Sequence, residues 1–159
     1  MPMPPYLISA SLVLCEKVLI EQEGVPSAIR MIDIFYVSPV PPGVTLPPGM
    51  TEDNCMPLIQ AYALLLLKAK TGHLEEHDLE EHDLEFRLIN TLGETSTVSV
   101  ARGGFKSPIA DATTGLTVNA QISIAVKKYG TCYLCVLLDG EEIIRTPFTL
   151  TRQSVAQAA

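Results

Sequence analysis

Apolar side chains occupy every second position from Leu116 to Val126, and the positions between them are mostly polar. An alternation with a period of two places all the apolar side chains on one face of an extended strand. The pattern therefore predicts a strand with one buried face, and its inward positions are Leu116, Val118, Ala120, Ile122, Ile124 and Val126.

Two further apolar runs follow this strand toward the C-terminus. A turn at 128–130 leads into the first run, Thr131–Leu138, and the second run is Glu141–Leu150. Asp139-Gly140 stands between them, and it favours a type I′ hairpin turn because both central residues of that turn need positive φ. We therefore predict that 116–150 forms an antiparallel meander.

Strand character is also present in five earlier runs. They are Tyr6–Leu14 with an extension to Gln22, Ser27–Val37, Leu58–Ala69, Asp83–Asn90 and Thr95–Ala101. The even-numbered positions from 8 to 14 and from 84 to 88 are predicted to face the core, because they are apolar and their neighbours are mostly polar. Ser27–Val37 is apolar on both faces, so we expect a central strand that is covered on both sides.

The connections complete the fold prediction. Ser38–Pro57 holds six of the twelve prolines, and proline removes ladder donors, so this segment is predicted to cross between two sheets rather than to act as a proline-rich ligand. Ser107-Pro108 and Gly115 are typical of the two ends of a short helix. The sequence therefore predicts an all-β antiparallel sandwich, immunoglobulin-like or C2-like, with one short helix in a loop.

The chain has 159 residues, of which 47% are hydrophobic, and this suits one domain over 1–159 with a core at about 6–150 and a tail at 151–159. Eighteen acids against eleven bases give a net charge of -7, which disfavours nucleic acid and anionic membranes as partners. The longest strongly apolar stretch, Ala61–Leu67, is too short for a membrane helix. With no recognisable signal peptide, we expect a soluble cytoplasmic protein.

The four cysteines, at 15, 55, 132 and 135, are expected to be reduced because no export signal is evident. Cys132 and Cys135 form a single CxxC motif within a strand, where positions i and i+3 point to opposite faces. Small buried hydrophobic residues are the favoured interpretation for these cysteines, over a metal or redox site.

All three histidines, His73, His77 and His82, lie among seven acidic residues in a segment where Glu76–Glu80 is repeated as Glu81–Glu85. A five-residue period fits neither strand nor helix, so the second copy is expected to begin a strand and the first to lengthen a loop. Imidazoles beside carboxylates can bind a divalent cation. These histidines are therefore weak metal-ligand candidates, and a solvated acidic loop is the favoured interpretation.

No familiar catalytic motif is present, including the nucleophile elbow, the phosphate loop and the zinc-protease pattern. We expect no enzyme, no catalytic residue and no cofactor; a hydrolase would need an unrecognised site, for instance Cys15 beside Glu16. The favoured function is association, as a homo-oligomer or with a protein partner, in which Pro147 marks an edge strand. The alternative is a module that binds a small ligand or a divalent metal through the loop 73–85 or a pocket between the sheets.

Short motifs at both ends of the chain resemble an uncharacterised bacterial family of small proteins, known as a domain of unknown function. The matching motifs are Leu14-Cys15-Glu16-Lys17-Val18 with Gly24, Pro26 and Ser27, then Gly130-Thr131-Cys132-Tyr133, Leu138-Asp139-Gly140-Glu141 and Pro147-Phe148. The resemblance spans roughly Leu7–Leu150 and implies an all-β sandwich without catalytic residues. The proline-rich crossing and the doubled Glu-His-Asp-Leu-Glu depart from the pattern.

Overall fold

A computed structural model of the chain describes residues 3–21, 26–37, 43, 45–49, 58–70, 81–105 and 113–152. These residues form nine strands and no helix, which confirms the predicted all-β class. None of the described residues belongs to a helix long and apolar enough to cross a membrane. The strands are β1 (Leu7–Ile20), β2 (Pro26–Met31), β3 (Ile34–Val37), β4 (Leu58–Lys70), β5 (His82–Ile89), β6 (Thr95–Gly103), β7 (Thr113–Ala125), β8 (Gly130–Leu138) and β9 (Glu141–Arg152).

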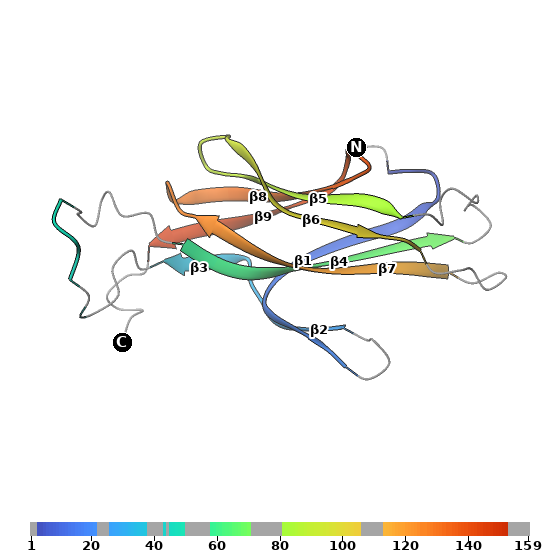
Figure 1. The fold of residues 1–159 in the computed structure, drawn as a ribbon, viewed down its shortest axis with the longest axis horizontal. Coiled ribbons are helices and arrows are strands. Elements are labelled where there is room, and N and C mark those ends of the chain that lie inside the picture. The colour runs from blue at the N-terminus through green and yellow to red at the C-terminus, as the bar shows by residue number, and fades with distance from the viewer. Residues whose placement is uncertain are drawn as a thin grey trace.

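The strands form two sheets that lie in two layers (Figure 1). One sheet has four strands in the order β2-β1-β4-β7, and the other has five in the order β3-β9-β8-β5-β6. Apolar side chains from both sheets meet in one hydrophobic cluster, which includes Leu65 and Ile122 from the first sheet and Phe86 and Leu134 from the second. Burial of this shared core is the main stabilising contribution to the fold.

The alternation of apolar residues correctly predicted the buried faces of β5 and β7. Leu84, Phe86 and Leu88 are 1%, 0% and 5% exposed. Five of the six inward positions predicted for β7 and its end are buried, and Val118 is partly buried against the same cluster. In β1 the pattern fails at Ile8, which is 48% exposed because the pairing of β1 with β4 shifts register between Leu7 and Ser9.

The hairpin of β8 and β9 confirms the predicted turn. Asp139 and Gly140 have φ values of 50° and 86°, as a type I′ turn requires. The predicted meander is wrong for its first strand, because β7 pairs with β4 in the four-stranded sheet. The turn after β7 therefore leads into the other sheet.

The predicted single central strand over Ser27–Val37 is wrong. The segment forms two strands at the ends of different sheets: β2 pairs with β1, and β3 pairs in parallel with β9. The chain changes sheet at Ile32 and Asp33, where the Ile32 amide donates to the carbonyl of Leu14 (2.8 Å) and the Thr149 amide donates to the carbonyl of Asp33 (2.9 Å). Apolar residues on both faces here reflect edge strands with exposed side chains, not a strand covered on both sides.

Two predicted connections are only partly described. The proline-rich segment does join strands of different sheets, β3 and β4, and its described residues 43 and 45–49 are not in a strand. Residues 107–112 of the predicted helix lie outside the described residues, whereas Thr113–Gly115 belong to β7, so the prediction that Gly115 ends a helix is wrong.

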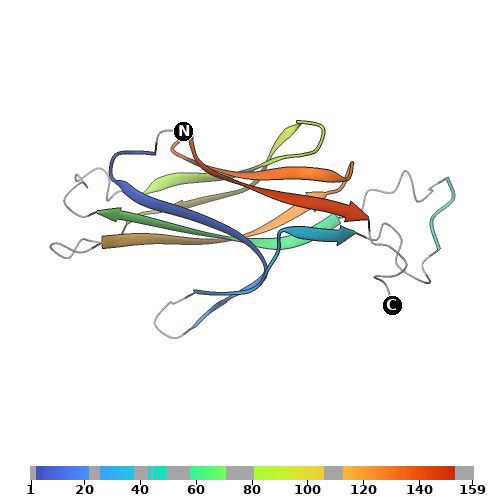
Figure 2. The same ribbon diagram turned by 180° about the vertical axis from the view of Figure 1, so that it is seen from behind.

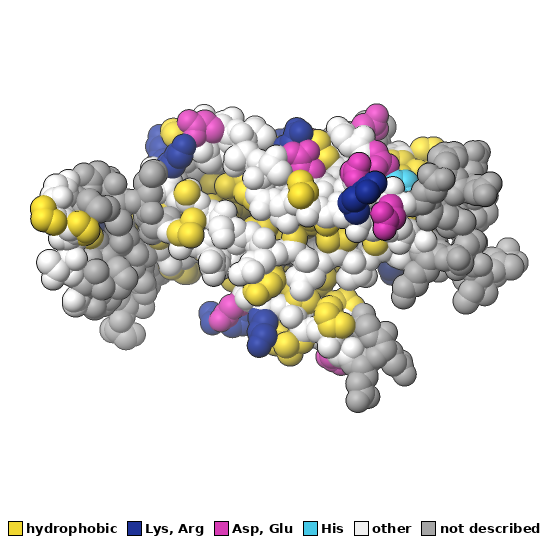
Figure 3. Space-filling view, in the orientation of Figure 1, with side chains coloured by type: hydrophobic (Ala, Val, Ile, Leu, Met, Phe, Trp, Pro, Cys, Tyr) yellow, Lys and Arg dark blue, Asp and Glu magenta, His cyan; other side chains and the backbone are white. Residues whose placement is uncertain are grey.

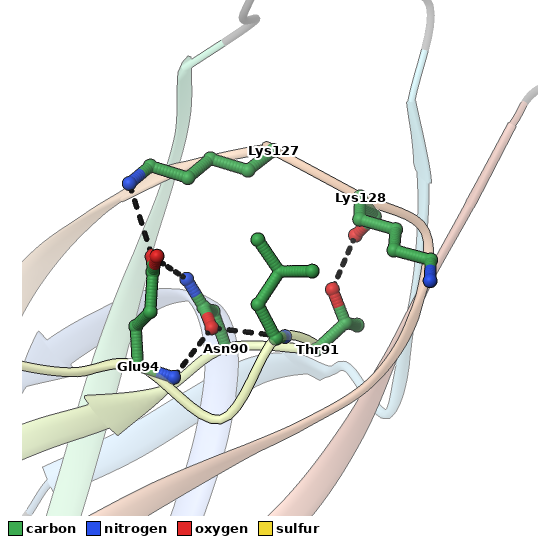
Figure 4. A network of polar contacts seen from close by, with 6 residues as sticks. Asn90, Thr91, Glu94, Lys127 and Lys128 are labelled. Carbon is green, nitrogen blue, oxygen red and sulfur yellow. Dashed lines mark hydrogen bonds and ion pairs between the residues drawn. The ribbon is translucent and has the colours of Figure 1, made fainter.

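Polar contacts join the β5–β6 turn to the turn after β7 (Figure 4). The Asn90 Oδ1 atom accepts from the amides of Leu92 (3.0 Å) and Glu94 (2.9 Å), and this closes the first turn. Lys127 Nζ donates to Glu94 (3.1 Å), and Thr91 Oγ1 donates to the carbonyl of Lys128 (3.1 Å). These bonds link the ends of the two sheets.

Candidate functional site

His82 is the only histidine among the described residues; His73 and His77, and with them most of the first repeat copy, lie outside them. The second copy begins β5, as predicted. The favoured interpretation as a solvated loop is wrong for His82. This residue is only 7% exposed, and its Nδ1 atom lies 2.6 Å from Asp139 Oδ2. Nearby, Arg102 pairs with Asp83 (2.9 Å) at the surface, where Figure 3 shows basic and acidic side chains beside the histidine.

Aromatic rings surround this histidine. The His82 ring centroid lies 6.0 Å from that of Tyr6 and 5.8 Å from that of Phe105, and Tyr6 and Phe105 meet edge to face at 5.9 Å. We call Tyr6, His82, Phe105 and Asp139 the His82 cluster. It joins four segments that are distant in sequence, so its geometry favours a role in holding the fold together.

The Asp139 carboxylate anchors the β8–β9 turn to the start of β5. Its Oδ1 atom accepts from the Asp83 amide (3.0 Å), and the Asp139 amide donates to the carbonyl of Asp83 (2.8 Å). Burial favours a higher pKa for Asp139, but the hydrogen bonds from His82 and the Asp83 amide, with the attraction of His82, bring this pKa below its usual value. Within the described ranges no three His, Cys, Asp or Glu residues form a metal-binding group.

The three described cysteines are free, and their burial agrees with the prediction that they are small buried hydrophobic residues. Cys132 belongs to the shared core, while Cys135 lies beside Glu142 near the opposite face of β8, so the thiols diverge as strand geometry requires. Burial and the neighbouring Glu142 carboxylate raise the pKa of Cys135 to about 11. This thiol stays protonated at neutral pH and is a poor nucleophile.

Cys15 and Glu16 do not combine into a reactive pair. The Cys15 thiol donates to the carbonyl of Tyr62 at 3.6 Å, and burial raises its pKa. Glu16 instead forms an ion pair with Arg30 at 3.0 Å, and both of those side chains are exposed. Neither group is placed to activate the other.

The hairpin of β1 and β2 extends away from the two-layered body (Figure 1). Four large apolar side chains on it are exposed, and we call them the hairpin surface: Leu19 (41% exposed), Ile20 (59%), Ile29 (38%) and Met31 (71%). The register places Leu19, Ile29 and Met31 on one face of the hairpin and Ile20 on the other. Hydrophobic side chains gather on this hairpin beside basic and acidic ones in Figure 3. Sequence reasoning missed this surface because its residues continue apolar patterns that were assigned to the core.

The comparisons with known proteins leave the function to be argued from these residues. No family model and no curated protein matches the chain. One matched structure is the alkylpurine DNA glycosylase AlkC of Pseudomonas fluorescens, bound to DNA containing an abasic site analogue, with 13% identity and a TM-score of 0.35. The match covers 58% of this chain and 26% of the glycosylase chain. Because the TM-score is so low, this likeness carries no argument.

Proposed function

We propose that this protein is a non-enzymatic, single-domain β-sandwich, immunoglobulin-like or C2-like, that acts in the cytoplasm through association with itself or with a protein partner. Kinship with the bacterial family of unknown function is part of this proposal. The observation that supports association best is the hairpin surface, where four large apolar side chains are exposed on a projecting hairpin. Exposed apolar side chains that gather on one face are typical of interaction sites, and the register places Leu19, Ile29 and Met31 on the same face of the hairpin.

The position of β2 adds to this argument. Among the described strands β2 pairs only with β1, so its other edge offers backbone donors and acceptors to a further strand. Edge strands that avoid association usually carry inward charges or few apolar side chains, whereas β2 carries Ile29 and Met31. Arg30 is its only charged residue and is paired with Glu16.

The chemistry of the described titratable groups supports a role without catalysis. Cys15, Cys132 and Cys135 all have raised pKa values because they are buried. The carboxylate of Asp139 is occupied by hydrogen bonds from His82 and the Asp83 amide. These groups are engaged in holding the fold.

Light scattering over a concentration series tests the self-association form of the proposal. Leu19→Arg/Ile29→Arg places two charges on the hairpin surface, and Val100→Arg is the matched control on the edge strand β6, where Val100 is 73% exposed. We expect the wild type and the control to form assemblies whose mass rises with concentration, and the double variant to remain monomeric. A wild type that is monomeric at every concentration would contradict self-association.

Affinity capture tests the form with a protein partner. A partner retained by the wild type and by Val100→Arg, but not by Leu19→Arg/Ile29→Arg, would support it. Equal retention by all three proteins would contradict a role for the hairpin surface. No observation on the described residues favours the alternative of metal or ligand binding by the loop 73–85. His82 already forms a hydrogen bond with Asp139.

A further inference from the structure

Among the described residues, two strands that lie inside their sheets have stretches with only one strand neighbour, and both stretches lie on the same side of the molecule. β1 pairs with β4 over Leu7–Cys15 and with β2 only from Cys15 onward. β9 pairs with β8 along most of its length but with β3 only over Thr149–Arg152. Figure 2 shows β1 and β9 side by side on its near face, in blue and red. We call this side the β1–β9 flank.

Two hollows follow each other along this flank. The first, of about 550 Å³, is lined by Ile8–Ala10 of β1, Ile143–Arg145 of β9 and Met3, which precedes β1. The second, of about 350 Å³, is lined by Leu12–Leu14 of β1, Thr146 and Pro147 of β9, and Met31–Asp33. Because the order is the same along both strands, the hollows form one line beside β1. Six residues of β1, from 8 to 13, span about 20 Å.

Hydrogen bonds mark both ends of the open edge of β1. The Leu7 amide donates to the carbonyl of Pro4 (3.0 Å), and the carbonyl of Leu14 accepts from Ile32 (2.8 Å). Pro147 has no amide proton to donate, so an added strand would form fewer backbone hydrogen bonds with β9 than with β1. An extended segment can bond to an open strand edge and place alternate side chains in the hollows, whereas a helix cannot pair with that edge.

Charge distinguishes between the candidates for such a segment. Asp33 lines the second hollow and makes no ion pair with any other described residue. A second copy of this chain would bring another net charge of -7, whereas a segment with a basic residue would pair with Asp33. Charge complementarity therefore favours a basic segment of a different protein.

We infer that the β1–β9 flank binds an extended segment of a partner protein, apolar at alternate positions and carrying a lysine or arginine that meets Asp33. The segment adds as a strand to the open edge of β1. This inference rests on the proposed function, because it names a partner for association and the surface that the partner occupies.

A peptide library displayed on phage tests the inference with the full-length chain as target. The library holds random nine-residue peptides, and enriched sequences are synthesised with a fluorescent label for anisotropy measurements. We expect enriched peptides to alternate apolar and polar residues and to carry a basic residue. Ile8→Arg and Asp33→Lys should weaken their binding by roughly tenfold or more. Val100→Arg is the control and should leave binding unchanged.

Two further measurements keep the test decisive if a variant folds poorly. In the wild type, peptide binding should slow amide hydrogen exchange within residues 8–13 of β1. In Asp33→Lys, replacing the basic residue of the peptide with glutamate should restore binding. Failure to enrich any peptide, binding that is indifferent to Ile8→Arg, or protection elsewhere would overturn the inference.

The two proposals can fail separately. If no peptide binds the flank but Leu19→Arg/Ile29→Arg abolishes assembly, association stands and the flank inference is wrong. If peptides bind the flank while the hairpin variant neither changes the mass nor loses a partner, the flank inference stands and the role of the hairpin surface is wrong. A dimer that Ile8→Arg dissociates would show that a second copy occupies the flank, which would also overturn the inference.

Discussion

The His82 cluster and the hairpin surface use their side chains in opposite ways. In the cluster a polar side chain is buried, and its ring nitrogen lies 2.6 Å from a carboxylate oxygen. On the hairpin surface large apolar side chains are exposed, with Met31 71% accessible. A buried polar group destabilises the fold unless it is hydrogen-bonded. An exposed apolar group contributes favourable free energy only when another surface covers it and removes it from water. Substitutions in the cluster should therefore change folding, and substitutions on the hairpin should change association.

Asp139→Ala should have the largest effect on stability. The variant leaves His82 and the Asp83 amide without their acceptor and places alanine at a φ of 50°, so we expect the free energy of unfolding to fall by about 2 kcal/mol. Urea denaturation measures this loss. Asp139→Asn should lose less, since asparagine tolerates the left-handed region and keeps an acceptor oxygen. An unchanged midpoint in the alanine variant would show that the cluster does not hold the turn.

Acid should weaken the cluster through the same carboxylate. The pKa of Asp139 is lowered in the folded chain, so its contribution to stability is present above its unfolded pKa and is lost as the pH falls through its folded pKa. We expect the stability difference between the wild type and Asp139→Asn to shrink as the pH falls below about 4. Urea denaturation at a series of pH values measures it. A difference that is constant down to pH 2 would contradict this assignment.

The hairpin variant Leu19→Arg/Ile29→Arg should change stability much less than Asp139→Ala. Both side chains are more than a third exposed, and surface substitutions usually shift the free energy of unfolding by less than about 0.5 kcal/mol. Urea denaturation of a dilute, monomeric sample tests this expectation. A loss as large as that of Asp139→Ala would mean that the hairpin surface is part of the folding core, and this would remove the contrast between the two regions.

Deletion of residues 76–80 should have the smallest effect. It removes one copy of the repeat and His77 but leaves the residues of β5, including His82, in place. A shorter connection between β4 and β5 changes the loop-closure entropy by only a few tenths of a kcal/mol. We expect unchanged stability and no measurable zinc binding before or after the deletion, as judged by calorimetric titration. Zinc binding that disappears with the deletion would support the metal-binding alternative.

The repeat shows which features of the candidate sites could be predicted from the sequence and which could not. The sequence predicted correctly that the second copy of the repeat begins a strand and, from the alternation, that Leu84 faces the core. It could not predict that His82 is buried, because the carboxylate that accepts from it belongs to Asp139, 57 residues away. Likewise, Asp139 was identified from its turn, and its contact with His82 depends on the pairing of β5 with β8.

Alternation by itself determined that β5 and the region of β7 from Leu116 onward are strands and which of their side chains face the core, because the period of two is a local property of an extended chain. The type I′ turn was equally local, since the backbone preferences of Asp139 and Gly140 are enough to favour it. Only the tertiary structure decided which sheet each strand joins: it divided Ser27–Val37 between two sheets and separated β7 from β8. Sheet membership depends on pairing between distant segments, and many pairings satisfy the same alternation. For the same reason, the exposed hairpin surface and the open β1–β9 flank became visible only once every strand had its neighbours.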